Sequence, residues 1–417
     1  MGRGIQANST MREAITPRLT EHDEQAVEYT DSVKVCPAPD PHHQEKEPKM
    51  SQRNYRAAII GTGGIAHAHA QALQASGRAS LVAVADVDAA RAAEFAAKYG
   101  VPRSHTSAEE LLREERPDFV HLCTPPHLHA PLAIACLEAG VTALVEKPPT
   151  LSLAEFDALA DAERRSTAHV ATVLQHRFGA GAIRLRRLAD AGELGRPLLA
   201  TCLTQWYRDE EYFAVPWRGT WESEGGGPTM GHGIHQFDLL FSVLGPWREV
   251  TAVAARQSRS VDTEDVSMAL VTFENGAVAT VVNSVLSPRQ TSQLRFDYER
   301  ATVEVDHLYG YTDDDWTVTP APGHDDVTVL WGRDGSAGDG GRSGHGHWLK
   351  AVLDALDKGE APPVTVEDAR RTMEFVAALY ASAFTGERVR TGQITADSPF
   401  AQRMDGTGTP WERVRNP

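Results

Sequence analysis

Short apolar runs alternate with longer alanine-rich stretches from Arg56 onward. The strand-like runs are "RAAII" at residues 56–60 and further runs at 80–86, 118–123, 141–146 and 169–174. Strands that alternate with helical segments in this order build a parallel sheet covered by helices on both faces. The pattern therefore predicts an α/β domain over residues 53–175.

The second half of the chain has a different pattern. Segments such as "DVSMALVTFENGAVATVVNSV" have the composition of strands, and Asn275-Gly276 inside this one suits a hairpin turn. The run "TMGHGIHQFDLLFSVLG" has a helical pattern instead and ends at Gly245, a residue type that commonly terminates helices. We expect residues 176–417 to form a second α/β domain.

Two polar segments fall outside these patterns. Residues 1–52 are polar, broken by prolines and without periodicity, which is typical of a segment that buries too little apolar surface to become ordered. Residues 332–348 are rich in glycine and precede the terminal helical segments. These features predict a disordered tail and a mobile loop.

Charge and cysteine content narrow the class of protein. The 417 residues include 57 acidic and 41 basic side chains, a formal net charge of −16. This balance argues against a general role on nucleic acid or on an anionic membrane, since both need a concentrated positive surface. No apolar run approaches the ~18 residues of a membrane span. The four cysteines show no CxxC pairing, which predicts a reducing, cytoplasmic location rather than a disulfide scaffold.

A glycine-rich turn follows the first predicted strand. Gly61, Gly63 and Ala66 fit G-x-G-x-x-G/A, in which the first glycine permits a tight turn and the second lets the backbone approach a pyrophosphate. The small third residue lets the helix pack closely on the strand. Gly64 and Ile65 complete a loop that would face the phosphates at a helix N-terminus. The sequence therefore predicts a dinucleotide site.

An acidic residue ends the second predicted strand. Asp86 lies close to the offset of ~20 residues at which a carboxylate can bind the adenosine ribose hydroxyls. Asp88 adds a second negative charge, and no arginine immediately follows Asp86 to bind a 2′-phosphate. This favours NAD over NADP. The alternative is that Asp86 only caps the helix that begins near Asp88.

Two further strands end in candidate ligand segments. "TPPHLH" begins at Thr124 and Pro125, and "EKPP" begins at Glu146 and Lys147. Ligands of a doubly wound sheet bind beyond the carboxyl ends of its strands, so both segments are expected to face the cofactor crevice. Lys147 is therefore a candidate site residue rather than a surface cation.

The run "GGGPTMGHGIHQFD" holds two histidines three residues apart, His232 and His235. On a helix they would share roughly one face. A metal site needs at least a third convergent ligand. The pairs His232/His235, 127/129 and 345/347 supply two each, so we expect no metal.

The chain resembles the Gfo/Idh/MocA oxidoreductases, the group of glucose-fructose oxidoreductase and inositol dehydrogenase. The resemblance covers roughly residues 53–400 and is carried by "GTGGIA", "CTPPHLHAPLAIACLEAG", "EKPP", "GGGPTMGHGIHQFDLL" and "VTFENGAVAT". It implies an α/β fold with an N-terminal Rossmann dinucleotide-binding domain and a C-terminal α/β domain on a large open, mostly antiparallel sheet. One face of that sheet is often covered by another subunit, so the resemblance also implies a homodimer or homotetramer.

Members of the family use the lysine of the EKP motif together with an aspartate and a histidine. The aspartate usually lies four residues before the histidine, and a second aspartate lies three residues after it. This pattern places the histidine at His235 and the later aspartate at Asp238, whereas the first aspartate position is Gly231, a departure from the family. The hydroxyl proton of a secondary alcohol is best removed by a group that titrates near neutrality, which fits His235 as general base or acid. Lys147 would stabilise the developing alkoxide.

The remaining residues are assigned by the same resemblance. His129 looks like the family residue near the nicotinamide, and Glu146 like its neighbour on the cofactor side. His232 is a candidate substrate contact or relay, and Asp238 could hydrogen-bond His235 or stabilise the helix. The predicted substrate pocket is bordered by Lys147, Arg177, the segment 207–221 with Tyr207, Trp217 and Arg218, His232 and Asp238. The alternative for the aromatic residues is that they belong to the ordinary core of the sheet. The predicted cofactor residues are Gly61, Gly63, Gly64, Ile65, Ala66, Asp86, Thr124, Pro125, His129, Glu146 and Lys147.

The resulting hypothesis is an NAD-dependent dehydrogenase that acts on a secondary hydroxyl of a sugar, inositol or related polyol. Two alternatives remain open. Some members of the family use the hydride step transiently to break a glycosidic bond, with the cofactor recycled. Others are binding proteins that respond to a dinucleotide without catalysis, and Gly231 at the aspartate position favours this alternative mildly.

Overall fold

The structure, a computed structural model, describes residues 53–333 and 342–411. The predicted tail at 1–52 lies outside the described residues, as do residues 334–341 of the predicted mobile loop.

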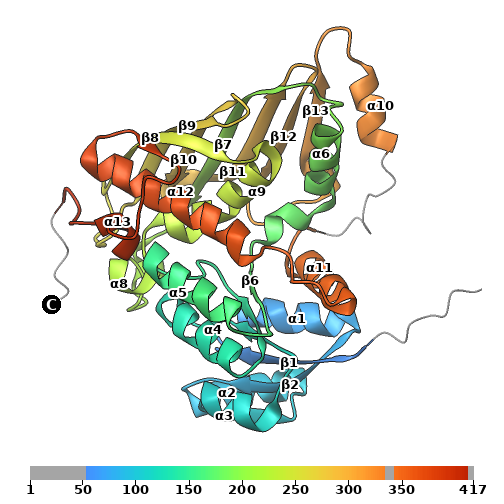
Figure 1. Ribbon diagram of the computed structural model, residues 1–417, viewed down its shortest axis with the longest axis vertical. Helices are drawn as coiled ribbons and strands as arrows, with labels where there is room; N and C mark the ends of the chain where they lie inside the picture. The colour runs from blue at the N-terminus through green and yellow to red at the C-terminus, as the bar shows by residue number, and fades with distance from the viewer. Residues whose placement is uncertain (1–52, 334–341, 412–417) are drawn as a thin grey trace, which may run out of the picture. The chain divides into compact units, whose positions relative to one another are not determined.

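The first half of the described chain forms a six-stranded parallel sheet of order β3-β2-β1-β4-β5-β6 (Figure 1). Its strands are β1 (Tyr55–Ile60), β2 (Ala79–Ala85), β3 (Arg103–His105), β4 (Phe119–Leu122), β5 (Thr142–Val145) and β6 (Val170–Thr172). The apolar runs thus form strands, as predicted. The sequence did not reveal β3, because this three-residue edge strand is polar and half-exposed or exposed.

Helices cover both faces of this sheet. They are α1 (Ala66–Ser76), α2 (Ala89–Tyr99), α3 (Ala108–Glu115), α4 (His129–Glu138) and α5 (Leu153–Arg164). Successive residues of β1 enter two separate apolar clusters, because side chains alternate across a strand. Ala57 and Ile59 belong to the cluster that includes Leu73 of α1, while Ala58 and Ile60 belong to that of α3 and α4. Because residues 57–60 of β1 are buried on both faces of the sheet, their apolar run is continuous.

The second half forms an eight-stranded sheet of order β13-β12-β11-β7-β10-β9-β8-β14. Its strands are β7 (Pro197–Tyr207), β8 (Trp247–Ala255), β9 (Val266–Phe273), β10 (Val278–Ser284), β11 (Leu286–Tyr298), β12 (Ala301–His307), β13 (Trp316–Pro320) and β14 (Val389–Arg390). Only β7 and β10 pair in parallel, so the sheet is mostly antiparallel, as the family resemblance implied. The predicted turn at Asn275-Gly276 joins β9 to β10.

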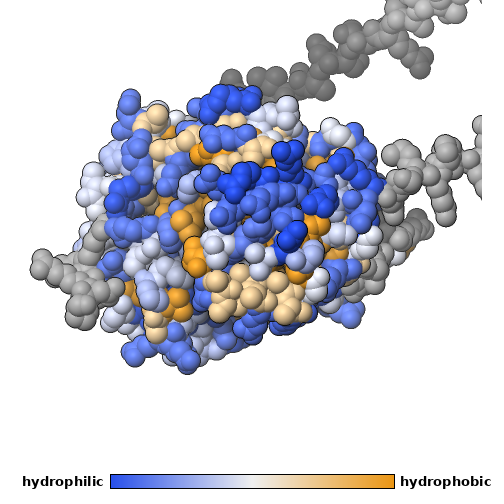
Figure 2. All heavy atoms as spheres, turned by 90° about the horizontal axis from the view of Figure 1, so that it is seen from below, coloured by the Kyte–Doolittle hydropathy of each residue, from blue (hydrophilic) through white to orange (hydrophobic). Residues whose placement is uncertain are grey.

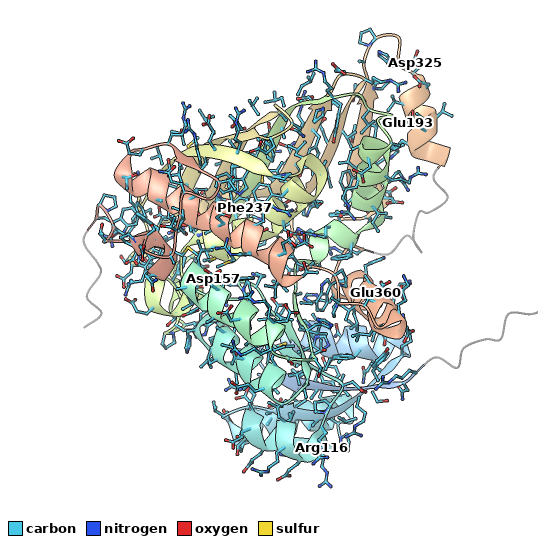
Figure 3. The ribbon with its side chains drawn as sticks, viewed as in Figure 1. Arg116, Asp157, Glu193, Phe237, Asp325 and Glu360 are labelled. Carbon is cyan, nitrogen blue, oxygen red and sulfur yellow. The ribbon has the colours of Figure 1, made fainter. Side chains whose placement is uncertain are left out.

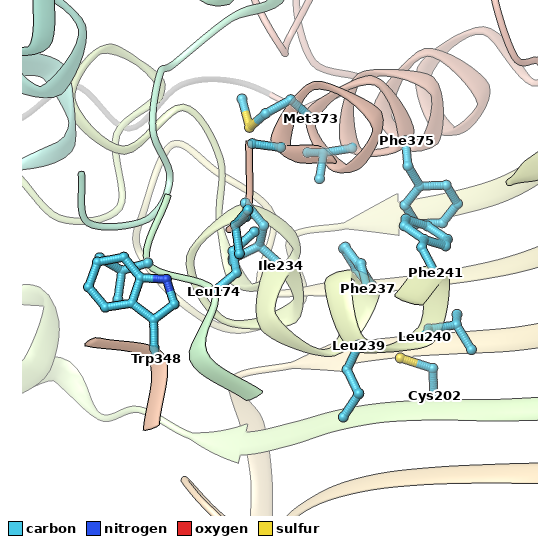
Figure 4. Packing of buried hydrophobic residues seen from close by; sticks show 14 of the residues in the cluster. Leu174, Cys202, Ile234, Phe237, Leu239, Leu240, Phe241, Trp348, Met373 and Phe375 are labelled. Carbon is cyan, nitrogen blue, oxygen red and sulfur yellow. The ribbon is translucent and has the colours of Figure 1, made fainter. Parts of the chain in front are cut away.

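The helices of this half are α6 (Ala180–Asp190), α7 (Glu210–Phe213), α8 (Trp221–Glu224), α9 (Ile234–Leu244), α10 (Asp326–Arg333), α11 (His345–Lys358), α12 (Val366–Thr385) and α13 (Pro399–Gln402). One face of the sheet packs on α9 and α12, where the rings of Phe237 and Phe241 lie 5.1 and 4.9 Å from that of Phe375 (Figure 4). Figure 3 shows Phe237 in this interior layer. The predicted helix ends at Gly245, as expected.

The opposite face of the large sheet exposes apolar side chains. Val253, Met268 and Leu270 are 67%, 55% and 65% exposed, and they lie on β8 and β9, neighbouring strands close to the β14 edge of the sheet. Met268 lies opposite Val253 in the register, so the exposed side chains are continuous across strands. By contrast, the view from below the molecule is mainly hydrophilic with scattered apolar patches (Figure 2).

Helix α11 returns from late in the chain to pack beside α1 (Figure 1). Arg78, which follows α1, forms ion pairs of 2.6 and 2.7 Å with Asp354 and Asp357. Tyr55 of β1 donates a 2.8 Å hydrogen bond to the same Asp357. These contacts join α11 to the nucleotide-binding half, and the proposed division of the chain at residue 175 stays a prediction.

Among the described helices, none has both the length and the apolar character needed to cross a membrane.

Candidate active site

The glycine loop between β1 and α1 leaves room for a ligand beside a helix N-terminus. Gly61 has φ +88°, and a Cβ there would lie 2.8 Å from backbone atoms of Cys123 and Thr124, so the position requires glycine. A Cβ on Gly63 or Gly64 would meet no atom within 4 Å. The loop therefore has the close packing and the open side that a pyrophosphate needs.

Asp86 follows β2 and faces the same loop. Its carboxylate accepts hydrogen bonds from the amide and hydroxyl of Thr62, both at 2.9 Å. Partial burial opposes ionisation, but the bonds from the amides of Asp88 and Thr62 and from Arg91 hold the pKa of Asp86 below its usual value. Asp88 is the residue that caps α2. Arg91, which the sequence analysis did not consider, reaches back to Asp86 at 2.9 Å.

Glu146 directly follows β5 and lies in a buried cluster of histidines. Its Oε1 accepts from His69 Nε2 at 2.9 Å and from His345 Nε2 at 3.2 Å, and its Oε2 accepts from the Lys147 amide at 3.1 Å. His69 Nδ1 lies 2.8 Å from His121 Nδ1. Burial raises the pKa of Glu146, but the bonds from His345 and His69 outweigh it and hold that pKa well below the ordinary value. The cluster thus holds an ionised carboxylate directly before Lys147.

The same cluster supplies the convergent third ligand that was missing in the sequence. Within the described residues, ligand atoms of His69, Glu146 and His345 lie within 4.8 Å of one another, a spacing that a divalent ion could use. The direct hydrogen bonds already pair these groups without an ion. The expectation that the protein uses no metal stays a prediction.

His129 ties two ligand segments together. Its Nδ1 lies 2.7 Å from the carbonyl of Pro148 and its Nε2 lies 2.8 Å from that of Thr124. The Pro148 carbonyl belongs to the EKPP segment. The Thr124 carbonyl belongs to the TPPHLH segment, in which Pro125 is the following residue. His129 therefore lies between the two candidate ligand segments that follow β4 and β5, and its one N–H donates to one of the two carbonyls.

Lys147 links the nucleotide-binding half to the glycine-rich run. Its Nζ donates a 2.8 Å hydrogen bond to the carbonyl of Gly231. Burial lowers the pKa of Lys147 below its ordinary value, against the opposing charges of Glu146 and Glu224. Lys147 and Gly231 are both half-buried, so this contact is partly open to solvent.

The glycine-rich run forms a π-helix, Thr229–Gly233, that leads directly into α9. A Cβ on Gly227 would lie 2.0 Å from the Glu264 carbonyl, and one on Gly233 would lie 2.3 Å from Asn283 Oδ1. Close packing therefore explains these glycines. Gly231 is different, because a Cβ there would meet no atom within 4 Å. The position where the family carries an aspartate is thus open space.

The two histidines of the run differ in burial. His235 is 2% exposed, and neither ring nitrogen has a hydrogen-bond partner among the described residues. Its ring stacks on that of His176 at 4.8 Å and 26°. Burial, with the charges of Lys147 and His176, holds the pKa of His235 well below its ordinary value. His232 is half-buried and packs edge-on against Trp206 at 5.0 Å.

Arg177 and Asp238 are bound to each other. Arg177 Nε donates to Asp238 at 2.7 Å, its Nη2 makes a second bond to the same carboxylate, and its Nη1 lies 3.3 Å from Asp368. The bidentate pair neutralises Asp238, whose side chain is fully buried. The structure thus pairs Asp238 with Arg177 rather than with His235. Their predicted contact with substrate stays a prediction.

The predicted pocket border contains aromatic and cationic residues that contact one another. Arg218 lies 3.7 Å over the ring of Tyr212 and 5.1 Å over that of Trp217, which places the two predicted border residues together. Arg208 lies over the rings of Trp206 and Tyr212. The strand pattern could have identified Trp206 as buried, since it follows an alternating run, but nothing in the pattern showed which aromatic rings meet.

Comparison with known families covers both halves of the chain. Residues 55–173 match the family described as oxidoreductase family, NAD-binding Rossmann fold. Residues 182–306 match the GFO/IDH/MocA C-terminal domain.

Curated relatives include glucoside and inositol dehydrogenases. The chain is 27% identical to D-glucoside 3-dehydrogenase of Escherichia coli over 367 residues, which cover 82% of this chain and 98% of that protein. It is 30% identical to the NAD(+)-dependent scyllo-inositol 2-dehydrogenase of Bacillus subtilis, over 57% of this chain and 69% of that protein. Among solved structures, the WlbA dehydrogenase of Bordetella pertussis in complex with NADH and UDP-GlcNAcA is 26% identical, with a TM-score of 0.71 over 81% of this chain and 99% of that one.

Proposed function

The chain belongs to the GFO/IDH/MocA oxidoreductase family, and from this premise we propose that it is a dehydrogenase that moves a hydride between a secondary hydroxyl of a sugar or polyol and NAD. The observation that carries the proposal is the bond from Lys147 Nζ to the carbonyl of Gly231. It joins a cation at the carboxyl end of a Rossmann strand to the helical run that bears His232 and His235.

The glycine loop and Asp86 support NAD as the cofactor. The open side of Gly63 and Gly64 fits a pyrophosphate, and the ionised Asp86 fits the ribose hydroxyls. A negative charge at that position opposes the 2′-phosphate of NADP, although Arg91 beside it would weaken the discrimination. When bound, NAD supplies the hydride acceptor for the substrate carbon.

The protein residues handle the hydroxyl proton and the charge on its oxygen. Because its pKa is well below the ordinary value, His235 is neutral at physiological pH and has a lone pair available for the proton. The Lys147 ammonium donates to the substrate oxygen and stabilises the alkoxide charge. The Gly231 carbonyl orients that ammonium. His232, on the accessible wall, contacts a neighbouring substrate group.

Self-association through the large sheet is the second part of the proposal. The continuous exposed row that includes Val253, Met268 and Leu270 is unusual for a surface in contact with water, and a second copy of the chain would cover it in a homodimer or homotetramer.

The described cysteines, Cys123, Cys136 and Cys202, are buried free thiols, which supports a reducing, cytoplasmic compartment.

Formation of NADH with a panel of inositols, aldoses, glycosides and uronic acids tests the catalytic proposal. We expect a substrate-dependent NADH signal with NAD that falls about 10²- to 10⁴-fold in Lys147→Met and in His235→Gln. Lys350→Met is the matched control, since Lys350 is exposed on α11 and paired with Asp354.

Each alternative function predicts a different result. Cleavage of a glycoside without accumulation of NADH would identify a cofactor-recycling glycosidase. Binding of NAD with no turnover of any compound would identify a dinucleotide-responsive binding protein and would refute the dehydrogenase proposal. Equal loss of activity in Lys350→Met would show that the effect of Lys147→Met is not specific.

A further inference from the structure

We propose that the substrate pocket takes a sugar with an anionic group, a carboxylate or a phosphate. The inference rests on the proposed function and names the substrate class of the same site. Its basis is a pair of arginines, Arg208 and Arg218, that share one aromatic ring beside His232 and whose hydrogen bonds in the described part of the chain go to neutral oxygens rather than to acidic residues.

The arginines lie next to His232. The His232 ring is 5.0 Å from the ring of Trp206 and 6.1 Å from that of Tyr212. The guanidinium carbon of Arg208 is 4.8 and 5.0 Å from the centres of these two rings, and that of Arg218 is 3.7 Å from the centre of Tyr212. Two positive charges therefore flank the aromatic wall that His232 contacts.

Neutral groups provide the hydrogen bonds of these guanidinium groups. Arg208 Nη1 donates to the Tyr207 carbonyl at 2.9 Å and to Gln290 at 3.5 Å, and Arg218 Nη1 donates to the Tyr212 carbonyl at 3.3 Å. The Nε atoms of both arginines are buried, and neither has a partner among the described residues. Cations removed from water need an opposite charge, and a carboxylate or phosphate is the partner whose geometry matches a guanidinium fork.

The surrounding charges leave this wall positive. Burial lowers the pKa of His232, and the charges of Lys147, Arg208 and Arg218 lower it further, with no acidic group acting against them. Glu224 interacts electrostatically with Arg218 and Lys147, but burial raises the pKa of Glu224 to about 7, so this carboxyl is only partly ionised at neutral pH. The acidic residues 209–211 point to solvent.

Glycine at position 231 also favours an anionic substrate. A carboxylate at this position would neutralise Lys147 and repel an anionic substrate. The chain instead has glycine there, with open space where the side chain would be. The departure from the family and the two unpaired arginines thus favour the same substrate charge.

Matched substrates test the proposal with the full-length protein and NAD. Glucose, glucuronate and glucose 6-phosphate, and galactose with galacturonate, differ mainly in the charge at one carbon. We expect kcat/KM for an anionic member to exceed that of its neutral partner by about ten- to a hundred-fold, the value of one or two charge-assisted hydrogen bonds. Preference for the carboxylate or for the phosphate identifies which anion the pocket takes.

Charge-removing variants link the preference to the arginines. Arg208→Gln and Arg218→Gln are expected to lose activity on the anionic sugar and little on the neutral one, while Arg208→Lys and Arg218→Lys retain part of the preference. Arg259→Gln is the matched control, because Arg259 stacks on Tyr207 at 5.0 Å but is not among the charges that act on His232. A general fall in activity or folding would appear equally with both substrates.

A binding measurement separates this inference from the proposed function. Calorimetry with NADH-loaded protein is expected to show tighter binding of glucuronate than of glucose, lost in Arg218→Gln. Binding of this kind without turnover would overturn the dehydrogenase proposal and support the anionic site. Turnover of neutral sugars at least as good as that of the anionic ones, or equal effects of the arginine variants on both, would overturn the anionic site and leave the dehydrogenase proposal intact.

Discussion

Restoring the family carboxylate by Gly231→Asp should change the pH dependence of the site. A Cβ at this position meets no atom within 4 Å, so the side chain fits without displacing a neighbour. The new carboxylate would lie four residues before His235, beside the Lys147 ammonium that already contacts the Gly231 carbonyl. The substitution therefore adds one negative charge to a site in which His235 now has its pKa held well below the ordinary 6.5.

The size of the effect follows from the spacing. Residues four apart on a helix have Cβ atoms about 5–6 Å apart. A unit charge at ~5.5 Å in an effective dielectric of ~20 contributes about 3 kcal/mol, or about 2 pKa units. Neutralisation by Lys147 reduces this, so we expect the pKa of His235 to rise by about 1 to 2 units. A higher pKa keeps the histidine protonated to higher pH, so the acidic limb of the rate profile moves upward.

The assay is kcat/KM against pH, which reports on the free enzyme, together with titration of the histidine ring signals by NMR in the absence of substrate. Gly231→Asn is the control, since it has the same shape without the charge. Coincident acidic limbs in the Asp and Asn variants, with unchanged histidine titrations, would refute the assignment of His235 as the titrating base beside position 231.

Three other predictions concern Asp86, the glycines of the run and His345. Asp86→Ser should raise KM for NAD by about ten- to a hundred-fold and reduce the preference over NADP, as measured by kcat/KM with each cofactor; an unchanged ratio would contradict the ribose assignment. Gly233→Ala should lower the free energy of unfolding by about 1–3 kcal/mol in urea, because its Cβ would overlap a neighbouring amide, whereas Gly231→Ala should not destabilise the fold. His345→Ala should destabilise the protein by about 1–3 kcal/mol at neutral pH by leaving Glu146 with fewer donors. Because the folded-state pKa of Glu146 is depressed, this difference should shrink as pH falls below the ordinary value of 4.5, and a constant difference would argue against an ionised Glu146.

The fold was predictable where local pattern decides structure. The parallel strands and the helix ending at Gly245 followed from periodicity, because burial on one or both faces leaves a mark on neighbouring residues. The strands of the second sheet followed from the same signals, its mostly antiparallel character came from the family resemblance, and its strand order was not predicted. The three-residue β3 left no mark, since a polar edge strand resembles a loop.

The site was predictable only in part. Motif positions made Lys147 and His235 candidates, a role that stays a prediction, but the stack of His176 on His235 joins residues far apart in sequence. The donors to Glu146 were equally hidden, because His69 and His345 are ordinary helical residues until the fold brings them together. Spacing rules describe neighbours along one element, and these contacts cross between elements.

The setting of Glu146 has a consequence for biosynthesis. Its carboxylate receives one donor from His69, 77 residues earlier, and another from His345, 199 residues later. Synthesis from the N-terminus completes the six-stranded sheet well before α11 emerges from the ribosome. The nascent domain thus folds around a carboxylate that still lacks one of its donors, and the backbone of Lys147 gains its final support only when nearly the whole chain has been made.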